Sequence, residues 1–259
     1  MDLFNVKRFL NNIMKTLRKT FLLIKIFLKK FIYFDSDLTK DLFYILNKLN
    51  FNQLIIMDVG AYKGLWTSIY LKKYPKIIAY LIEPHQESFI NLKKKFSGQS
   101  NVNLFKVGFS NVNGSKEVNV NSKAYTNSLL ELHPEAPTSW KKNKFEHLYQ
   151  EIVETITLKD FVYKNNIKRI NVLKLDIQGY ESRVLKGAEK LLNDRLIDIV
   201  VLEVIVAPTY KDQSKISEIF KIFDENDYKL YGIYDIEKNS KRDKIQQFDV
   251  IFYNPDLTL

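Results

Sequence analysis

Short runs of apolar, mostly β-branched residues recur along the chain and are typical of buried strands. They lie at residues 54–59, 77–82, 102–107, 170–176, 197–206 and 248–253. Segments with helical periodicity separate most of them, at residues 65–73, 86–96, 182–192 and 216–226. Strands that alternate with helices in this way predict an α/β fold with a doubly wound, mostly parallel sheet and helices on both faces.

The alternation is interrupted between residues 111 and 157. The turn "NVNG" predicts the start of a hairpin strand near residues 116–120, and a Pro-containing polar insertion follows at about residues 121–150. A long irregular insertion in a compact domain is usually a lid or a substrate loop. We therefore expect it to help choose the substrate.

The first 50 residues form a separate unit in the pattern, ahead of a catalytic domain at residues 51–259. Asp35, Ser36 and Asp37 have N-cap chemistry, and they precede a helix that reaches about Asn50. Residues 1–34 carry eight Lys or Arg residues against one acid, and therefore +7 of the chain's net charge of +10. On a helical wheel these cations lie opposite an apolar face, which predicts a basic amphipathic helix.

This first helix has two readings that the sequence leaves open. Residues 4–33 would lie on an anionic membrane surface as a peripheral contact, or the helix would pack its apolar face on the domain that follows. No uncharged run here is long enough for a transmembrane helix, and no cleavable small-residue site follows an apolar stretch. With no cysteine in the chain, a cytoplasmic protein is expected, peripheral at the inner face of the membrane if the first reading holds.

The stretch "LIIMDVGAYKG" places Asp58, Gly60 and Gly64 where a strand turns into a helix. In an open α/β sheet this turn lies at the ligand. Tyr62 stands where a dinucleotide-binding motif needs its second glycine, and Asp58 would repel phosphates but attract a cation. Glu83, at the end of the second strand, is suited to accept both hydrogens of a ribose diol. A ligand with a ribose, a cationic centre and no pyrophosphate is S-adenosylmethionine.

The motifs "DVGAYKG", "YLIEPH", "VGFSNVNG", "TLKDF" and "VLKLDIQGYESRVLKGAEKLL" occur in the order seen in FkbM-type methyltransferases, and the chain resembles this family over roughly residues 54–204. The resemblance implies a seven-stranded Rossmann-like methyltransferase sheet. It also implies O-methylation that depends on S-adenosylmethionine, commonly on a sugar hydroxyl of a glycan, a lipid-linked saccharide or a natural product. Gly108, in "VGFSNVNG", joins the expected cofactor-binding residues. Tyr62 and Lys159 depart from the family's usual Asn and Asp.

Three acids at strand or helix ends are candidates for the chemistry: Asp176, Glu181 and Glu203. Methyl transfer to oxygen needs a well-placed acceptor and gains from a general base, and Asp176 is the best candidate base. Glu181 and Glu203 would orient the acceptor. The alternatives are a helix cap for Glu181, a buried structural pair for Glu203, and a divalent cation held by all three.

The remaining candidates are weaker. His85 is expected to begin a helix near the ribose and, like His133 and His147, to lie on the surface. Three aromatic residues of the insertion would stack on a sugar or plug the domain core: Trp140, Tyr125 and Tyr149. Trp66 and Tyr70 are at helical spacing and are expected in the core. A nucleic-acid methyltransferase is disfavoured because the excess cations lie outside the domain, and an inactive membrane-associated binding protein is the remaining alternative.

Overall fold

The computed structural model describes residues 36–140, 145–239 and 243–259. The predicted amphipathic helix within residues 4–33 lies outside the described residues, so its contact with a membrane stays a prediction. Among the described residues, no helix is both long enough and apolar enough to cross a bilayer.

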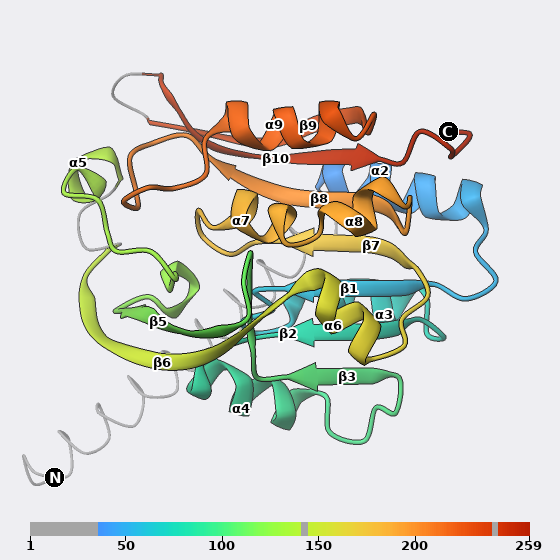
Figure 1. The fold of residues 1–259 in the computed structure, drawn as a ribbon, viewed down its shortest axis with the longest axis horizontal. Helices are drawn as coiled ribbons and strands as arrows, with labels where there is room; N and C mark the ends of the chain where they lie inside the picture. The colour runs from blue at the N-terminus through green and yellow to red at the C-terminus, as the bar shows by residue number, and fades with distance from the viewer. Residues whose placement is uncertain (1–35, 141–144, 240–242) are drawn as a thin grey trace, which may run out of the picture.

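A seven-stranded sheet forms the centre of the molecule, with the strand order β3-β2-β1-β7-β8-β10-β9 (Figure 1). Its strands are β1 (Ile55–Val59), β2 (Ile78–Ile82), β3 (Val102–Phe105), β7 (Ile170–Leu175), β8 (Ile197–Ile205), β9 (Lys229–Lys238) and β10 (Ile245–Tyr253). Every neighbouring pair is parallel except those that β10 makes with β8 and β9. The predicted doubly wound, mostly parallel sheet is confirmed.

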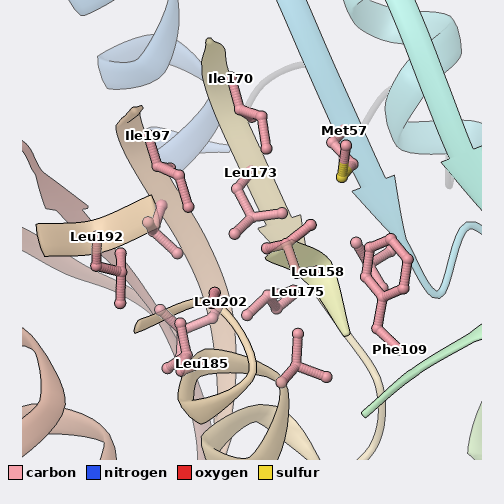
Figure 2. Close-up of a cluster of buried hydrophobic side chains, with 14 of the residues drawn as sticks. Met57, Phe109, Leu158, Ile170, Leu173, Leu175, Leu185, Leu192, Ile197 and Leu202 are labelled. Atoms are coloured by element: carbon pink, nitrogen blue, oxygen red, sulfur yellow. The ribbon is translucent and has the colours of Figure 1, made fainter. Parts of the chain in front are cut away.

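Helices cover both faces of this sheet, as the alternating pattern predicts. One face is packed by α2 (Asp37–Leu49), α3 (Leu65–Lys73) and α4 (Gln86–Lys95), and the other by α6 (Leu158–Lys164), α7 (Glu181–Lys186), α8 (Glu189–Asn193) and α9 (Ile216–Glu225). Figure 2 shows the second face, where Leu158, Leu185 and Leu192 of the helices meet strand residues such as Leu173 and Leu202. Because both faces are covered, the strands read as continuous apolar runs.

The helix predicted to end near Asn50 is confirmed as α2. The Ser36 side chain accepts a hydrogen bond from the backbone N–H of Thr39, and Asn50 ends the helix in the left-handed conformation. Its buried residues lie at helical spacing and pack on the sheet: Leu38, Leu42, Ile45 and Leu46.

A second, three-stranded sheet corrects two sequence expectations. It contains β4 (Gly108–Ser110), β5 (Gly114–Asn121) and β6 (His147–Thr157) in the order β4-β6-β5. The strand predicted near residues 116–120 is confirmed as β5. Because β6 lies between β4 and β5, however, the turn "NVNG" joins strands that do not pair, so it does not form a hairpin. The irregular insertion is also shorter than residues 121–150, since β6 begins at His147. The first four residues of β6 are all exposed, so this part of the strand lacks an apolar period.

Between β5 and β6 the insertion contains a short 3-10 helix, η1 (Ala124–Thr126), and one turn of helix, α5 (Ala136–Ser139). Both lie on the side of the sheet where the parallel strands have their carboxyl ends, which is the left side of Figure 1. The edge strand β9 was also not predicted, because most of its side chains are exposed and its charged and apolar residues follow no regular alternation.

The segment predicted as one helix at residues 182–192 is two short helices, α7 and α8, that meet at Gly187. A Cβ atom at Gly187 would lie 2.5 Å from the carbonyl oxygen of Ser110 and 3.2 Å from the Cα of Asn111. The helix pair therefore packs directly on the backbone that follows β4.

We expect Gly187→Ala to lower the free energy of unfolding by about 1–3 kcal/mol, because backbone atoms must move to admit the methyl group. The backbone φ of Gly187 is −70°, so the loss would come from the clash and not from strain in the backbone. Urea denaturation measures the difference. Lys186→Ala, an exposed change one residue earlier, is the matched control, and equal stability of the two variants would contradict the close approach.

Candidate active site

A cavity of about 300 Å³ lies at the carboxyl ends of the parallel strands. The turns after β1, β2 and β7 line it, together with β8, β10 and the insertion. Its lining includes three carboxylates, Glu83, Asp176 and Glu203, and no Lys or Arg among the described residues. The described wall of this cavity therefore favours a cationic ligand and disfavours an anionic one.

Glu83 lies where β2 ends, and its carboxylate is buried. One oxygen accepts a hydrogen bond from the backbone N–H of Tyr62 (2.8 Å) and the other from that of His85 (3.0 Å). Burial raises the pKa of Glu83 to about 7, and the two N–H donors oppose that rise. Each oxygen keeps acceptor capacity, so the carboxylate can still bind hydroxyl donors.

The turn after β1 holds Tyr62 in the left-handed conformation (φ +47°) and places it on the cavity wall. A Cβ at Gly60 would lie 1.9 Å from the carbonyl oxygen of Asp176, and one at Gly64 would lie 2.5 Å from the ring of Phe96. Gly60 and Gly108 line the cavity, but Gly64 does not. The glycines at 60 and 64 are therefore required by contacts within the protein.

Asp58 is buried and does not line the cavity. One carboxylate oxygen accepts a hydrogen bond from the Thr67 hydroxyl (2.7 Å), and the other lies 3.4 Å from the ammonium of Lys174. Asp58 was expected to attract a cationic ligand, but the cation beside it is a lysine of the neighbouring strand β7. Lys174 also lies 3.1 Å from Asp176, so it joins the two acids.

Asp176 and Glu203 reach the cavity, whereas Glu181 does not. Both side chains are partly buried, and that of Asp176 is one-third exposed. The carboxylate of Glu203 accepts hydrogen bonds from the side-chain amides of Gln178 (2.8 Å) and Gln247 (2.7 Å). Burial, followed by the nearby carboxylates of Asp176 and Asp249, raises the pKa of Glu203 well above its usual range.

Glu181 is buried at the start of α7 and accepts hydrogen bonds from the backbone N–H groups of Ile177 and Gly179, both 3.2 Å. Burial raises its pKa to about 7. The contacts favour the helix-start alternative for Glu181, because its carboxylate binds the turn after β7. The part of the chain that the structure describes has no group of three or more His, Asp or Glu side chains arranged for a metal ion.

Three residues at the site were missed by sequence reasoning: Gln178, Tyr210 and Asp249. The side-chain amide of Gln178 donates to both Asp176 and Glu203. The hydroxyl of Tyr210, which does not line the cavity, lies 2.9 Å from the amide oxygen of Gln178. Asp249 lies opposite Glu203 on β10, and burial raises its pKa to about 8. A polar residue before Gly179 was a visible signal for Gln178, but the antiparallel register that brings Asp249 to Glu203 was not.

His85 precedes the first residue of α4, as expected, but the surface position predicted for it is wrong. It is buried, lines the cavity and pairs with the Ser88 hydroxyl through Nδ1 (3.1 Å). His147 is exposed and His133 is half-buried, and neither lines the cavity. The predicted core positions of Trp66 and Tyr70 are confirmed by their burial.

The aromatic residues of the insertion separate into two groups. Tyr149 is exposed on β6 and lies away from the cavity. Trp140 is buried, donates from its indole N–H to the Thr209 hydroxyl (2.7 Å) and lines the cavity. Tyr125 also lines the cavity, and its ring meets that of Tyr62 edge to face at 6.4 Å.

Comparison with known proteins agrees with this arrangement. The model of the methyltransferase FkbM domain matches residues 58–230, more than half of the chain. The chain belongs to this family. The family predicted from the motifs is thereby confirmed.

A curated relative, Methyltransferase 1 of Beauveria bassiana, is 29% identical over 160 residues, which cover 57% of this chain and 63% of that protein. The match spans less than two thirds of the relative's length. Solved structures are similar at lower sequence identity. The fibrillarin pre-rRNA processing protein of Methanococcus jannaschii is 14% identical with a TM-score of 0.44, covering 78% of this chain and 66% of that one. TrmK of M. capricolum, in complex with S-adenosylhomocysteine, is 12% identical with a TM-score of 0.43, covering 80% and 66%.

We expect Glu181→Ala to lower the free energy of unfolding by about 1–3 kcal/mol, because two backbone N–H groups, one of them buried, would lose their acceptor. Urea denaturation at pH 8 checks this. Glu189→Ala is the control, since Glu189 also lies in the first turn of a helix but is exposed. If both variants are as stable as the parent, the carboxylate of Glu181 does not hold the turn.

Proposed function

We propose that this FkbM-domain protein transfers a methyl group from S-adenosylmethionine to a hydroxyl oxygen of a sugar, within a glycan, a lipid-linked saccharide or a natural product. The observation that carries the proposal is the cavity wall, which combines three carboxylates with no described Lys or Arg. Carboxylates attract a sulfonium and repel phosphate, so the wall matches a cationic methyl donor.

The residues present fit the cofactor. Glu83 offers a carboxylate that two backbone N–H groups hold in place at the strand end, where a ribose diol would donate to it. The turn from Gly60 to Tyr62 lies beside it on the wall. When bound, the cofactor supplies an activated methyl group, so the protein needs mainly to place an oxygen opposite the methyl carbon.

The acceptor end of the cavity has the chemistry of a sugar site. Asp176 and Gln247 supply a charged group and an amide group that bind hydroxyls, and the aromatic rings of Tyr125 and Trp140 lie on the same wall. Asp176 is suited to take the acceptor's proton as the new C–O bond forms and the C–S bond breaks. Glu203 is less suited, because burial and the neighbouring carboxylates of Asp176 and Asp249 disfavour its ionised form, the form that could accept a proton.

The decisive experiment incubates the protein with methyl-labelled cofactor and separate fractions of glycans, glycolipids and RNA from the source cell. We expect label in a glycan or glycolipid fraction, and alkaline treatment should leave a stable ether. Label confined to RNA would overturn the proposed acceptor. No label in any fraction, together with no binding of S-adenosylmethionine by calorimetry, would overturn the enzymatic assignment.

Asp176→Asn should reduce methyl transfer by about 10²–10⁴-fold, because the variant keeps the shape but cannot accept the proton. Binding of S-adenosylhomocysteine, which lacks the sulfonium charge, should change little by calorimetry. Asp224→Asn, an exposed change on α9, is the control. A variant of Asp176 that retains full turnover would remove this residue from the role of base.

Cofactor binding should tighten as the pH rises from 6 to 8. Glu83 has a pKa of about 7 in the folded protein, so it is protonated below that pH and accepts hydroxyl hydrogens best above it. The affinity should fall by up to about tenfold for each pH unit below 7. Calorimetric titration with S-adenosylhomocysteine at several pH values checks this, and Glu83→Gln should remove the dependence. If the dependence persists in Glu83→Gln, another group is responsible.

A further inference from the structure

Gln178 has an unusual backbone and an unusually complete set of contacts. Its φ of +57°, followed by +92° at Gly179, makes two consecutive left-handed residues, a conformation that is strained for a residue with a Cβ. Two neighbours hold this turn: the Ser128 hydroxyl donates to the carbonyl oxygen of Gln178 (2.8 Å), and Ser214 donates to that of Gly179 through both its N–H and its hydroxyl. Strain maintained in this way is common at functional sites.

The side-chain amide of Gln178 stands between the two acids of the cavity. Its nitrogen donates to Glu203 (2.8 Å) and to Asp176 (3.2 Å), which uses both amide hydrogens. Two carboxylates side by side repel each other, and an amide links them without adding a charge. The remaining oxygen of Asp176 lies at 3.1 Å from Lys174, so that carboxylate is held from two sides.

Tyr210 determines which way the amide points. Its buried hydroxyl lies 2.9 Å from the Gln178 amide oxygen and 2.8 Å from the carbonyl oxygen of Thr126, but it has one proton for two acceptors. The carbonyl of Thr126 already accepts from the Asn121 side chain (2.6 Å). The phenol proton is therefore best used on Gln178, which keeps the amide oxygen away from the carboxylates.

We propose that Gln178, oriented by Tyr210, is a positioning residue for methyl transfer, whose amide holds the Asp176 carboxylate where it meets the acceptor hydroxyl. The inference rests on the proposed function and deepens it. It also gives the insertion a second role, because the Ser128 hydroxyl donates to the carbonyl oxygen of Gln178.

The test compares Gln178→Met, Tyr210→Phe and the double variant, with the labelled cofactor and whichever fraction accepts label. Gln178→Met should lower kcat by about tenfold to a hundredfold, the size of loss expected when a reacting group is misplaced. Tyr210→Phe should lower it by about fivefold, and the double variant should be no slower than Gln178→Met, because Tyr210 acts through Gln178. The affinity for S-adenosylhomocysteine, measured by calorimetry, should stay within about twofold of the parent's in all three, because the cofactor-binding residues are untouched.

Tyr228→Phe is the matched control, since it removes another buried tyrosine hydroxyl, which donates to the carbonyl of Ile197 away from the cavity. It should leave kcat unchanged. Full turnover in Gln178→Met, or losses that add up in the double variant, would overturn the positioning role while the proposed function stands. Failure of the parent protein to methylate any fraction would instead overturn the proposed function, and with it this inference.

Discussion

The close approach of Gly60 to Asp176 is the contact on which the site depends. The N–H groups of Gly60 and Ala61 both donate to the carbonyl of Ile82, and that of Asp176 donates to Val59. These bonds join the ends of β1, β2 and β7, and a side chain at position 60 would separate two of them. Glu83 and Asp176 can therefore face one cavity only because a glycine lies between their strands.

Charge is distributed around this contact in two layers. Behind the wall, Lys174 lies between Asp58 and Asp176 and compensates for part of their negative charge. At the wall, Glu83, Asp176 and Glu203 face the cavity. Lys174 does not line the cavity, so a sulfonium would meet carboxylates directly and the lysine only at a distance. The preference for a cation, first argued from Asp58, is thus supplied by other acids.

Periodicity was sufficient for six of the seven strands of the central sheet, because these strands are covered by helices that have one apolar side. It failed for β6 and β9, whose exposed side chains follow no period. At the site, the position of Glu83 followed from the strand end alone. The position of Lys174 could also have been predicted, because the parallel register of β1 and β7 places it opposite Asp58. The position of Asp249 could not have been predicted, because the antiparallel register of β10 depends on packing between distant parts of the chain.

Their contacts in the structure distinguish the three candidate acids, Asp176, Glu181 and Glu203. Glu181 and Glu203 are both surrounded by donors, the first by backbone N–H groups of a turn and the second by two side-chain amides. For both, burial disfavours the ionised carboxylate, which is the form that can take a proton from an incoming hydroxyl. Asp176 keeps one-third of its side chain exposed to the cavity side. The proposed base is therefore the acid that lies partly exposed beside a lysine, and Lys174 and Gln178 hold it in place.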